Sequence, residues 1–130
     1  MSDSDFDDAL WLALFGRIHS AADLAQFPPG VRMYFSIRMV EWEGNGGFAQ
    51  VFENGVDEYF PDAKAGYLLL GDPASAHLLG RAASVASDDA ALDALNEFLD
   101  GAPWNGVPWS DGKRIAYVRA HRDEFRLPNP

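Results

Sequence analysis

The sequence predicts an all-α fold: a single compact bundle of about six or seven helices, with residues 1–130 as one domain. Apolar residues recur every three or four positions in several segments. Glycine and proline stand where those segments begin or end. Strand-like alternation of apolar and polar residues never persists for five positions. A chain of 130 residues, 48% of them hydrophobic, can bury a core without a metal or a disulfide.

The first helix is expected to be capped by Ser4, with Asp7 three residues later as a weak capping box. It is apolar nearly all round, so Leu12 and Phe15 are candidates for exposure in a self-associating module. The connection that follows contains one helical turn around Ala22 to Gln26. The main apolar stripe keeps a spacing of four residues: Phe6, Leu10, Leu14 and Ile18.

A second helix is expected from Pro29, where proline is tolerated in the first turn, to about Glu43. Its apolar residues fall on two sides, a pattern typical of a helix at the centre of its bundle. Gly44 then suits the position after the last helical residue, because glycine adopts the left-handed conformation without a steric penalty.

The remaining helices follow from their start and stop residues. Asp72 is the expected N-cap before Pro73, and Asp88 opens a later helix that Gly101 ends. The segment with Trp104 and Trp109 has no helical period and is expected to be a loop. The expected ranges are 47–53, 61–70, 73–86, 88–101 and 113–125.

Charge is the one unusual feature of the composition. Twenty acids against ten bases give a net charge of −10, which repels phosphate backbones and anionic lipid heads. We therefore expect neither direct nucleic-acid binding nor membrane binding, and a basic protein is the favoured partner. Solubility alone is an alternative reason for such a charge. The acidic N-terminus and the lack of an apolar run of about 20 residues predict a cytoplasmic protein.

Catalytic and metal-binding patterns are sparse in the sequence. The three histidines, His19, His77 and His121, lack a second histidine at metal-ligand spacing, and there is no cysteine. The GNGG segment lacks the lysine and hydroxyl residues of a phosphate-binding loop, and acids surround it. It is therefore expected to turn the chain. The sequence predicts no enzyme activity, no cofactor and no metal.

Acidic residues form one regular stripe on the helix that follows Asp88. Its members fall within about 80° of arc and span about 16 Å: Asp89, Asp93, Glu97 and Asp100. One charge per ~5.5 Å is sparser than the one per ~1.7 Å of duplex DNA. A mimic of DNA would therefore need most of the carboxylates gathered on one side. A second candidate cluster consists of Asp57, Glu58 and Asp62.

Amide side chains surround the glycine-rich turn. Asn45, Gln50 and Asn54 are expected to satisfy backbone groups left free where helices end. A polar recognition pocket built from the same amides is the alternative.

The stretch NGGFAQVFEN resembles the motif of a family of small helical bacterial proteins, a domain of unknown function named after a DNA-mimic member. Two further stretches, LLGDPASAHLLGRAA and IAYVRAHRDEF, look similar, so the likeness runs from about Val31 to Phe125. The loop with Trp104 and Trp109 has no counterpart. The matching motif positions are Asn45, Gly46, Gly47, Phe48, Gln50, Phe52 and Asn54.

The resemblance implies an all-α fold and no established catalytic activity. For a DNA-mimic member it implies acidic side chains that stand in for phosphates against a transcription factor. We interpret the motif as fold-determining, so this role would depend on the acidic surface and not on the motif.

The leading hypothesis is a non-enzymatic acidic binding protein that occupies the basic, nucleic-acid-binding surface of a partner. The alternatives are an immunity or inhibitor protein against a basic toxin, and a small-molecule-binding domain that uses the amide face. A homodimer is a further possibility.

Overall fold

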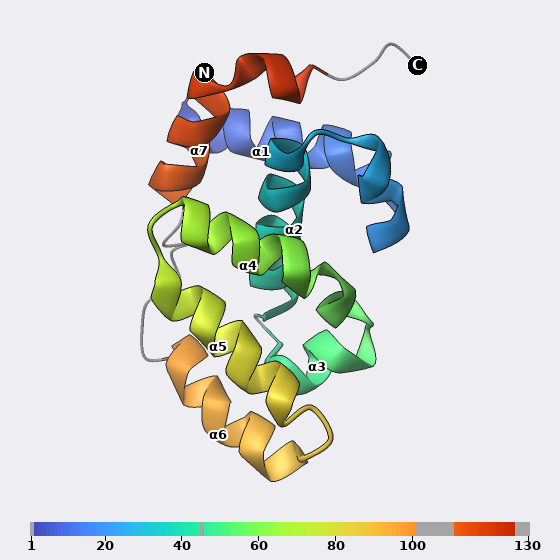
Figure 1. The fold of residues 1–130 in the computed structure, drawn as a ribbon, viewed down its shortest axis with the longest axis vertical. Coiled ribbons are helices and arrows are strands. Elements are labelled where there is room, and N and C mark those ends of the chain that lie inside the picture. The colour runs from blue at the N-terminus through green and yellow to red at the C-terminus, as the bar shows by residue number, and fades with distance from the viewer. Residues whose placement is uncertain (1, 45, 101–110, 127–130) are drawn as a thin grey trace.

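Helix α2 (Pro29–Gly44) lies at the centre of the fold and contacts most of the other elements (Figure 1). Its residues Val31, Phe35 and Val40 are completely buried, as the two-sided apolar pattern predicted. The computed structural model describes residues 2–44, 46–100 and 111–126. Every regular element in these residues is helical, which confirms the all-α class.

The helices follow one another in nearly the predicted order. The α-helices besides α2 are α1 (Asp3–Phe15), α3 (Phe48–Glu53), α4 (Phe60–Leu69), α5 (Pro73–Ser84), α6 (Asp89–Asp100) and α7 (Asp111–Ala120). Short 3₁₀ helices are η1 (Ala21–Gln26), η2 (Val56–Tyr59) and η3 (Arg122–Phe125). No helix in the described ranges is long and apolar enough to cross a membrane.

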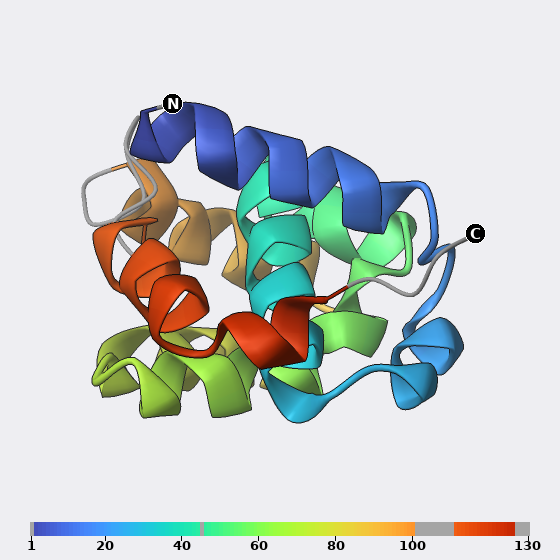
Figure 2. The same cartoon turned by 90° about the horizontal axis from the view of Figure 1, so that it is seen from above.

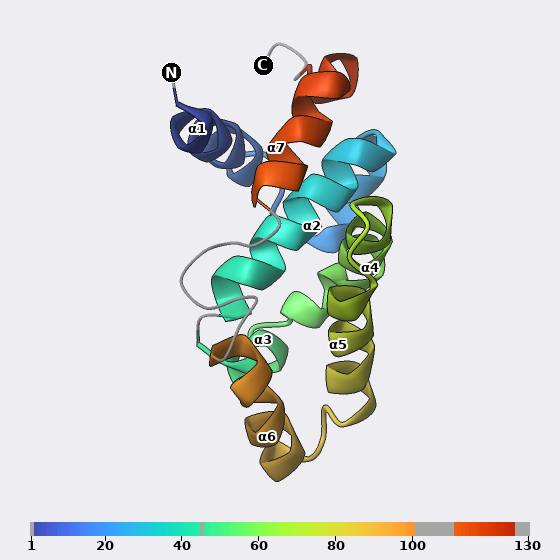
Figure 3. The same ribbon diagram turned by 90° about the vertical axis from the view of Figure 1, so that its left-hand side faces the viewer.

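The elements divide between two ends of an elongated molecule. Helices α1 and α7, with η3, lie at the upper end of Figure 1 (Figure 2). They contact α2 at both of its ends, since Glu124 of η3 accepts from the Gly30 amide and Arg114 of α7 bonds Glu41. Helices α3 and α6 pack together at the lower end, where α2 finishes (Figure 3). Helices α4 and α5 pack against each other along one side. Helix α1 and η3 therefore lie at the end of the molecule opposite α6 in Figure 1.

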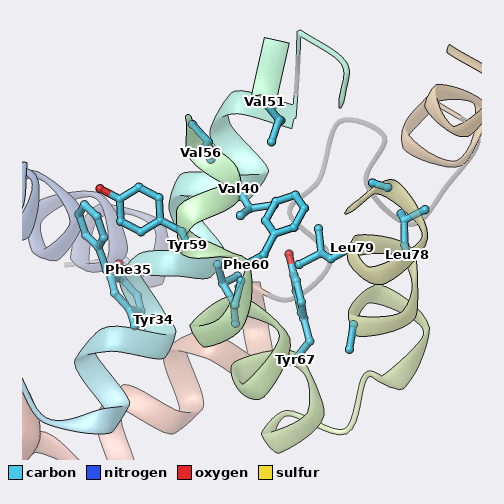
Figure 4. Packing of buried hydrophobic residues seen from close by; sticks show 14 of the residues in the cluster. Tyr34, Phe35, Val40, Val51, Val56, Tyr59, Phe60, Tyr67, Leu78 and Leu79 are labelled. Atoms are coloured by element: carbon cyan, nitrogen blue, oxygen red, sulfur yellow. The ribbon is translucent and has the colours of Figure 1, made fainter. Parts of the chain in front are cut away.

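The hydrophobic core fills the space between α2 and the helices around it (Figure 4). Tyr67 of α4 and Leu79 of α5 are completely buried, and so is Phe48 at the start of α3. The ring of Phe35 lies 5.0 Å from that of Trp11 and 5.7 Å from that of Tyr59. Aromatic side chains thus join α1, α2 and η2.

Two predicted helix ends are wrong in detail. The N-cap of α1 is Ser2 and not Ser4, because the Ser2 hydroxyl accepts a hydrogen bond from the Asp5 amide at 3.1 Å. Gly44 is the last residue of α2, and the left-handed glycines of the described chain are Gly47, Gly55 and Gly71. The chain therefore stays helical to Gly44 and reverses three residues later.

Two helix starts agree with the prediction, and one more predicted helix end is wrong. The Asp72 carboxylate accepts from the Ser75 amide at 3.3 Å, and Asp88 accepts from the Ala91 amide at 3.1 Å. The last α-helix ends at Ala120 and not near Phe125, since η3 follows as a separate turn. The segment with Trp104 and Trp109 lies outside the described residues.

Candidate protein-binding surface

Two long segments of the chain contain no lysine or arginine. Residues 39–63 carry six acids and no base, and residues 82–112 carry six more and no base. The rest of the chain holds eight acids and all ten bases, a net charge of +2. The net negative charge of the protein therefore comes entirely from these two segments.

The fold brings the two base-free segments together. Helix α3 belongs to the first and α6 to the second, and they pack against each other. The Phe48 amide donates to the Asn96 side-chain oxygen at 2.9 Å, and Leu92 and Leu95 of α6 are buried. We call the carboxylates on the last turn of α2, on α3 and at the start of α6 the acidic surface: Glu43, Glu53, Asp88, Asp89 and Asp93.

Part of the predicted acidic stripe lies on this surface. The side chains of Asp89 and Asp93 are exposed on α6. Glu97 and Asp100 continue the same helix, but their side chains lie outside the described residues. Sequence analysis did not include Glu43 and Glu53, since their proximity to α6 depends on the packing of α3 against it.

The members of the second predicted cluster, Asp57, Glu58 and Asp62, have different surroundings. Asp57 and Glu58 are exposed on η2, which packs against α3. The Glu58 carboxylate accepts from the Ala21 amide at 2.8 Å and so also holds η1 in place. Asp62 lies 3.8 Å from Arg32, so a base offsets its charge. Asp62 therefore contributes less to the negative field than Asp57.

The glycine-rich stretch turns α2 into α3, as predicted. The Gly46 amide donates to the Glu43 carbonyl at 3.1 Å, and the Gly47 amide donates to the Gly44 carbonyl at 2.9 Å. Gly47 has φ 88° and ψ 167°, a conformation open essentially to glycine alone. A Cβ at this position would lie 3.0 Å from the Asn96 side-chain nitrogen. Asn45 lies outside the described residues.

The amides of the motif make a contact that differs from the expected one. The side-chain nitrogens of Gln50 and Asn54 each lie 3.0 Å from the same Glu43 oxygen, to which they donate. They therefore fix a carboxylate at the end of α2, a partner that the sequence did not predict. Phe48 is fully buried, and the Phe52 ring packs 5.6 Å from that of Phe60.

Asn96 contacts the motif, and sequence analysis did not identify it. Its side-chain oxygen accepts the first amide of α3 and its nitrogen lies against Gly47. The sequence did contain a signal, because Asn96 follows Leu92 by four residues and so lies on the apolar face of α6. A polar residue on a buried face usually has a specific partner.

A buried ionic network lies at the upper end of the molecule. Asp7 and Arg114 are almost completely buried and lie 3.1 Å apart, and Arg38 lies 3.2 Å from Asp7. Arg114 also bonds Glu41 at 2.9 Å. The network joins α1, α2 and α7. Sequence analysis assigned Asp7 to a helix cap, whereas its carboxylate lies inside the protein.

Two tyrosines complete the network. The Tyr34 hydroxyl donates to Asp7 at 2.6 Å, and the Tyr67 hydroxyl donates to Glu41 at 3.2 Å. Burial raises the pKa of both hydroxyls well above the usual value, and the neighbouring carboxylates raise each pKa further. Both tyrosines thus remain protonated donors. The network is nearly sealed from solvent, which suits a structural role.

The cavity next to the buried network is too small for an organic ligand. The cavity beside Tyr34 and Arg114 has a volume of about 20 Å³, which is room for one water molecule. A typical ligand pocket occupies roughly 300–1,000 Å³. Within residues 2–44, 46–100 and 111–126, no group of three or more histidines and carboxylates is placed to hold a metal ion.

Some apolar side chains remain exposed near the first helix. Leu12 is 67% exposed, Phe15 is 40% exposed and Trp42 is 54% exposed. The Phe15 and Trp42 rings lie 5.7 Å apart. The exposure predicted for Leu12 and Phe15 is therefore confirmed, and a homodimer stays a prediction.

The arrangement defines a helical protein in which two acidic, base-free segments pack together through α3 and α6. The chain belongs to the family of DMP19-like proteins, whose model matches residues 25–121, about three quarters of its length. This match confirms the resemblance to a family named after a DNA mimic protein. No curated protein and no solved structure matches the chain significantly.

Proposed function

We propose that this protein is a non-enzymatic acidic binding protein that occupies the basic, nucleic-acid-binding surface of a partner, such as a transcription factor. One observation carries the proposal: the negative excess belongs to two segments that pack together through α3 and α6. Membership of the DMP19-like family supports it, since that family is named after a DNA mimic.

The packing of α3 against α6 supports the proposal, because it adds carboxylates to those of the α6 stripe. The stripe on α6 alone carries one charge per ~5.5 Å, which is too few to resemble a duplex. Glu43 and Glu53 add carboxylates from a neighbouring helix end, and Asp57 adds another on the adjacent η2. A surface with several rows of carboxylates presents a broader negative field to a basic cleft than one helix can.

A charged side chain that is already fixed in place can bind a partner more tightly than a mobile one. Two amide donors fix the Glu43 carboxylate, so less side-chain entropy is lost when a cation binds it. The same donors are then occupied, which weakens the alternative that Gln50 and Asn54 line an empty pocket for a small molecule.

A competition experiment with charge-matched variants tests the proposal. The full chain serves as bait to isolate its partner, and displacement of labelled DNA from that partner is followed by fluorescence anisotropy. The acidic-surface variant is Glu53→Gln, Asp89→Asn and Asp93→Asn. The control carries Asp5→Asn, Asp8→Asn and Asp123→Asn, three exposed acids away from that surface.

The wild type and the control variant are expected to displace DNA, and the acidic-surface variant to need at least about tenfold more protein. Equal displacement by both variants would contradict the proposal. Isolation of a basic toxin whose activity the wild type blocks would favour the immunity alternative.

A further inference from the structure

Three aromatic side chains from α1 and α2 form a cluster that is open to solvent on one side. The Trp11 ring lies 5.3 Å from that of Phe15 and 6.1 Å from that of Trp42. The Phe15 and Trp42 rings lie 5.7 Å apart, and both are exposed, as is Leu12. We call Trp11, Leu12, Phe15 and Trp42 the aromatic cluster. Exposed apolar side chains that gather in one place usually mark an interaction surface, whereas single ones do not.

The aromatic cluster lies next to the acidic surface. Trp42 and Glu43 follow each other on the last turn of α2, and their side chains diverge by about 100° around the helix axis. The Trp42 ring meets α1, and the Glu43 carboxylate meets the amides of α3. Figure 3 shows the end of α2 between α1 and α6. A partner that lies along the last turn of α2 would therefore contact both surfaces.

The charges around the aromatic cluster favour a cationic occupant. Helix α1 contains four acids and no base, and residues 39–63 contain no base. The nearest bases in the sequence, Arg17 and Arg38, are both engaged within the protein. The face of an aromatic ring also attracts a cation.

One contact of this kind already exists inside the molecule. The guanidinium carbon of Arg38 lies 5.2 Å from the centre of the Trp11 ring. Trp42 belongs to the same group of rings and is more than half exposed. A guanidinium from outside can therefore reach Trp42 in the way that Arg38 reaches Trp11.

We infer that the aromatic cluster anchors the basic partner, with an arginine side chain of the partner on Trp42 and an apolar side chain over Leu12. This inference rests on the proposed function, which supplies the basic partner. Tryptophan and arginine dominate the few residues that carry most of the binding energy in interfaces. A second copy of this chain fits less well, because a symmetric contact would bring the same base-free acidic segments toward each other.

The test uses two defined peptides and measures their binding by fluorescence anisotropy. The first peptide alternates arginine and leucine, and the second replaces each arginine with glutamate. Trp42→Leu keeps an apolar side chain but removes the ring, whereas Trp42→Phe keeps a ring. Leu68→Ala is the matched control, because Leu68 is an exposed apolar residue on α4. Circular dichroism checks that each variant is folded.

The arginine–leucine peptide is expected to bind the wild type and to shift the indole N–H NMR signal of Trp42, which the Trp42→Phe variant identifies. Its affinity should fall about fivefold in Trp42→Leu, stay within about twofold in Trp42→Phe, and be unchanged in Leu68→Ala. The acidic-surface variant should lose at least about threefold, and the glutamate–leucine peptide should bind at least about tenfold more weakly.

An unchanged affinity in Trp42→Leu would overturn the inference. The proposed function would then stand if the acidic-surface variant still lost affinity, and both would fail if it did not. Equal binding of the glutamate–leucine peptide would also overturn the inference, since the cluster would then have no preference for a cation. A third contradictory result is self-association of the wild type in sedimentation that Trp42→Leu abolishes, because the occupant would then be a second copy of this chain.

Discussion

At the scale of single residues, the glycine-rich stretch shows how one backbone conformation shapes the acidic surface. Gly47 holds the turn that carries the chain from the end of α2 into α3. Its neighbour Asn96 then binds the first amide of α3 and so fixes α6 against the turn. The relative position of Glu43 and Asp89 therefore depends on a residue without a side chain.

Gly47→Ala is expected to lower the free energy of unfolding by about 2–3 kcal/mol, from backbone strain and a crowded contact with Asn96. Gly55→Ala is the control, because Gly55 also has a positive φ, 71°, but nothing lies within 4 Å of a Cβ there. It should cost about 1–2 kcal/mol. Urea denaturation measures both. An equal or smaller cost at Gly47 would refute the close packing described for the turn.

Sequence reasoning could identify the turn but not its contacts. The cluster of glycines gave its position, because glycine is the usual residue at such breaks. Asn96 is distant in the chain from Gly47, and a single sequence gives no sign that the two meet. The contact of Gln50 and Asn54 with Glu43 could not be predicted for the same reason, since Glu43 faces them only after the turn has formed.

At the scale of elements, the helices could be predicted and their mutual attachment could not. Periodicity and caps located each α-helix to within a few residues, because both signals are local. The network of Asp7, Arg38, Glu41 and Arg114 joins three helices from distant parts of the chain. Each of these residues alone resembles an ordinary surface charge.

Arg114→Ala should therefore lower the free energy of unfolding by about 3–5 kcal/mol, since it leaves Asp7 and Glu41 buried without their main cation. Lys113→Ala changes the exposed neighbour and is expected to stay within about 0.5 kcal/mol of the wild type. Chemical denaturation followed by circular dichroism compares them. A loss below about 1 kcal/mol for Arg114→Ala would show that the network does not hold α7 in place.

At the scale of the whole molecule, the tyrosines predict how the fold responds to alkali. Burial is the main cause that raises the pKa of all four, and a carboxylate near each adds to it; the pKa of Tyr59 rises to about 12. A raised pKa in the folded state adds stability that is complete below the unfolded value of about 10. That stability is lost as the pH rises through the folded-state values.

Ultraviolet titration should therefore show little tyrosinate near pH ~10.5 in the native protein, followed by ionisation together with loss of helix at higher pH. In denaturant, all four tyrosines are expected to ionise near pH ~10. Reversible ionisation of all four near that pH, with the helical signal intact, would contradict the burial of their hydroxyls.

The charge distribution is also a property of the whole molecule. Composition gave the net charge of −10 but not its arrangement, which depends on the packing of α3 against α6. Residues 39–63 and 82–112 contain no base, so no lysine or arginine lies on α3 or α6 themselves. An account based on one negative surface therefore remains consistent with the structure.

The central claim is that the acidic surface contacts the basic surface of the partner. Zero-length cross-linking of the complex, which couples carboxylates to lysines in direct contact, tests this claim most directly. Mass spectrometry of the linked peptides identifies which acids are used. We expect links from Glu53, Asp89 and Asp93 to lysines on the partner's nucleic-acid-binding surface. Links confined to Asp5, Asp8 and Asp123, at the opposite end of the molecule, would contradict it.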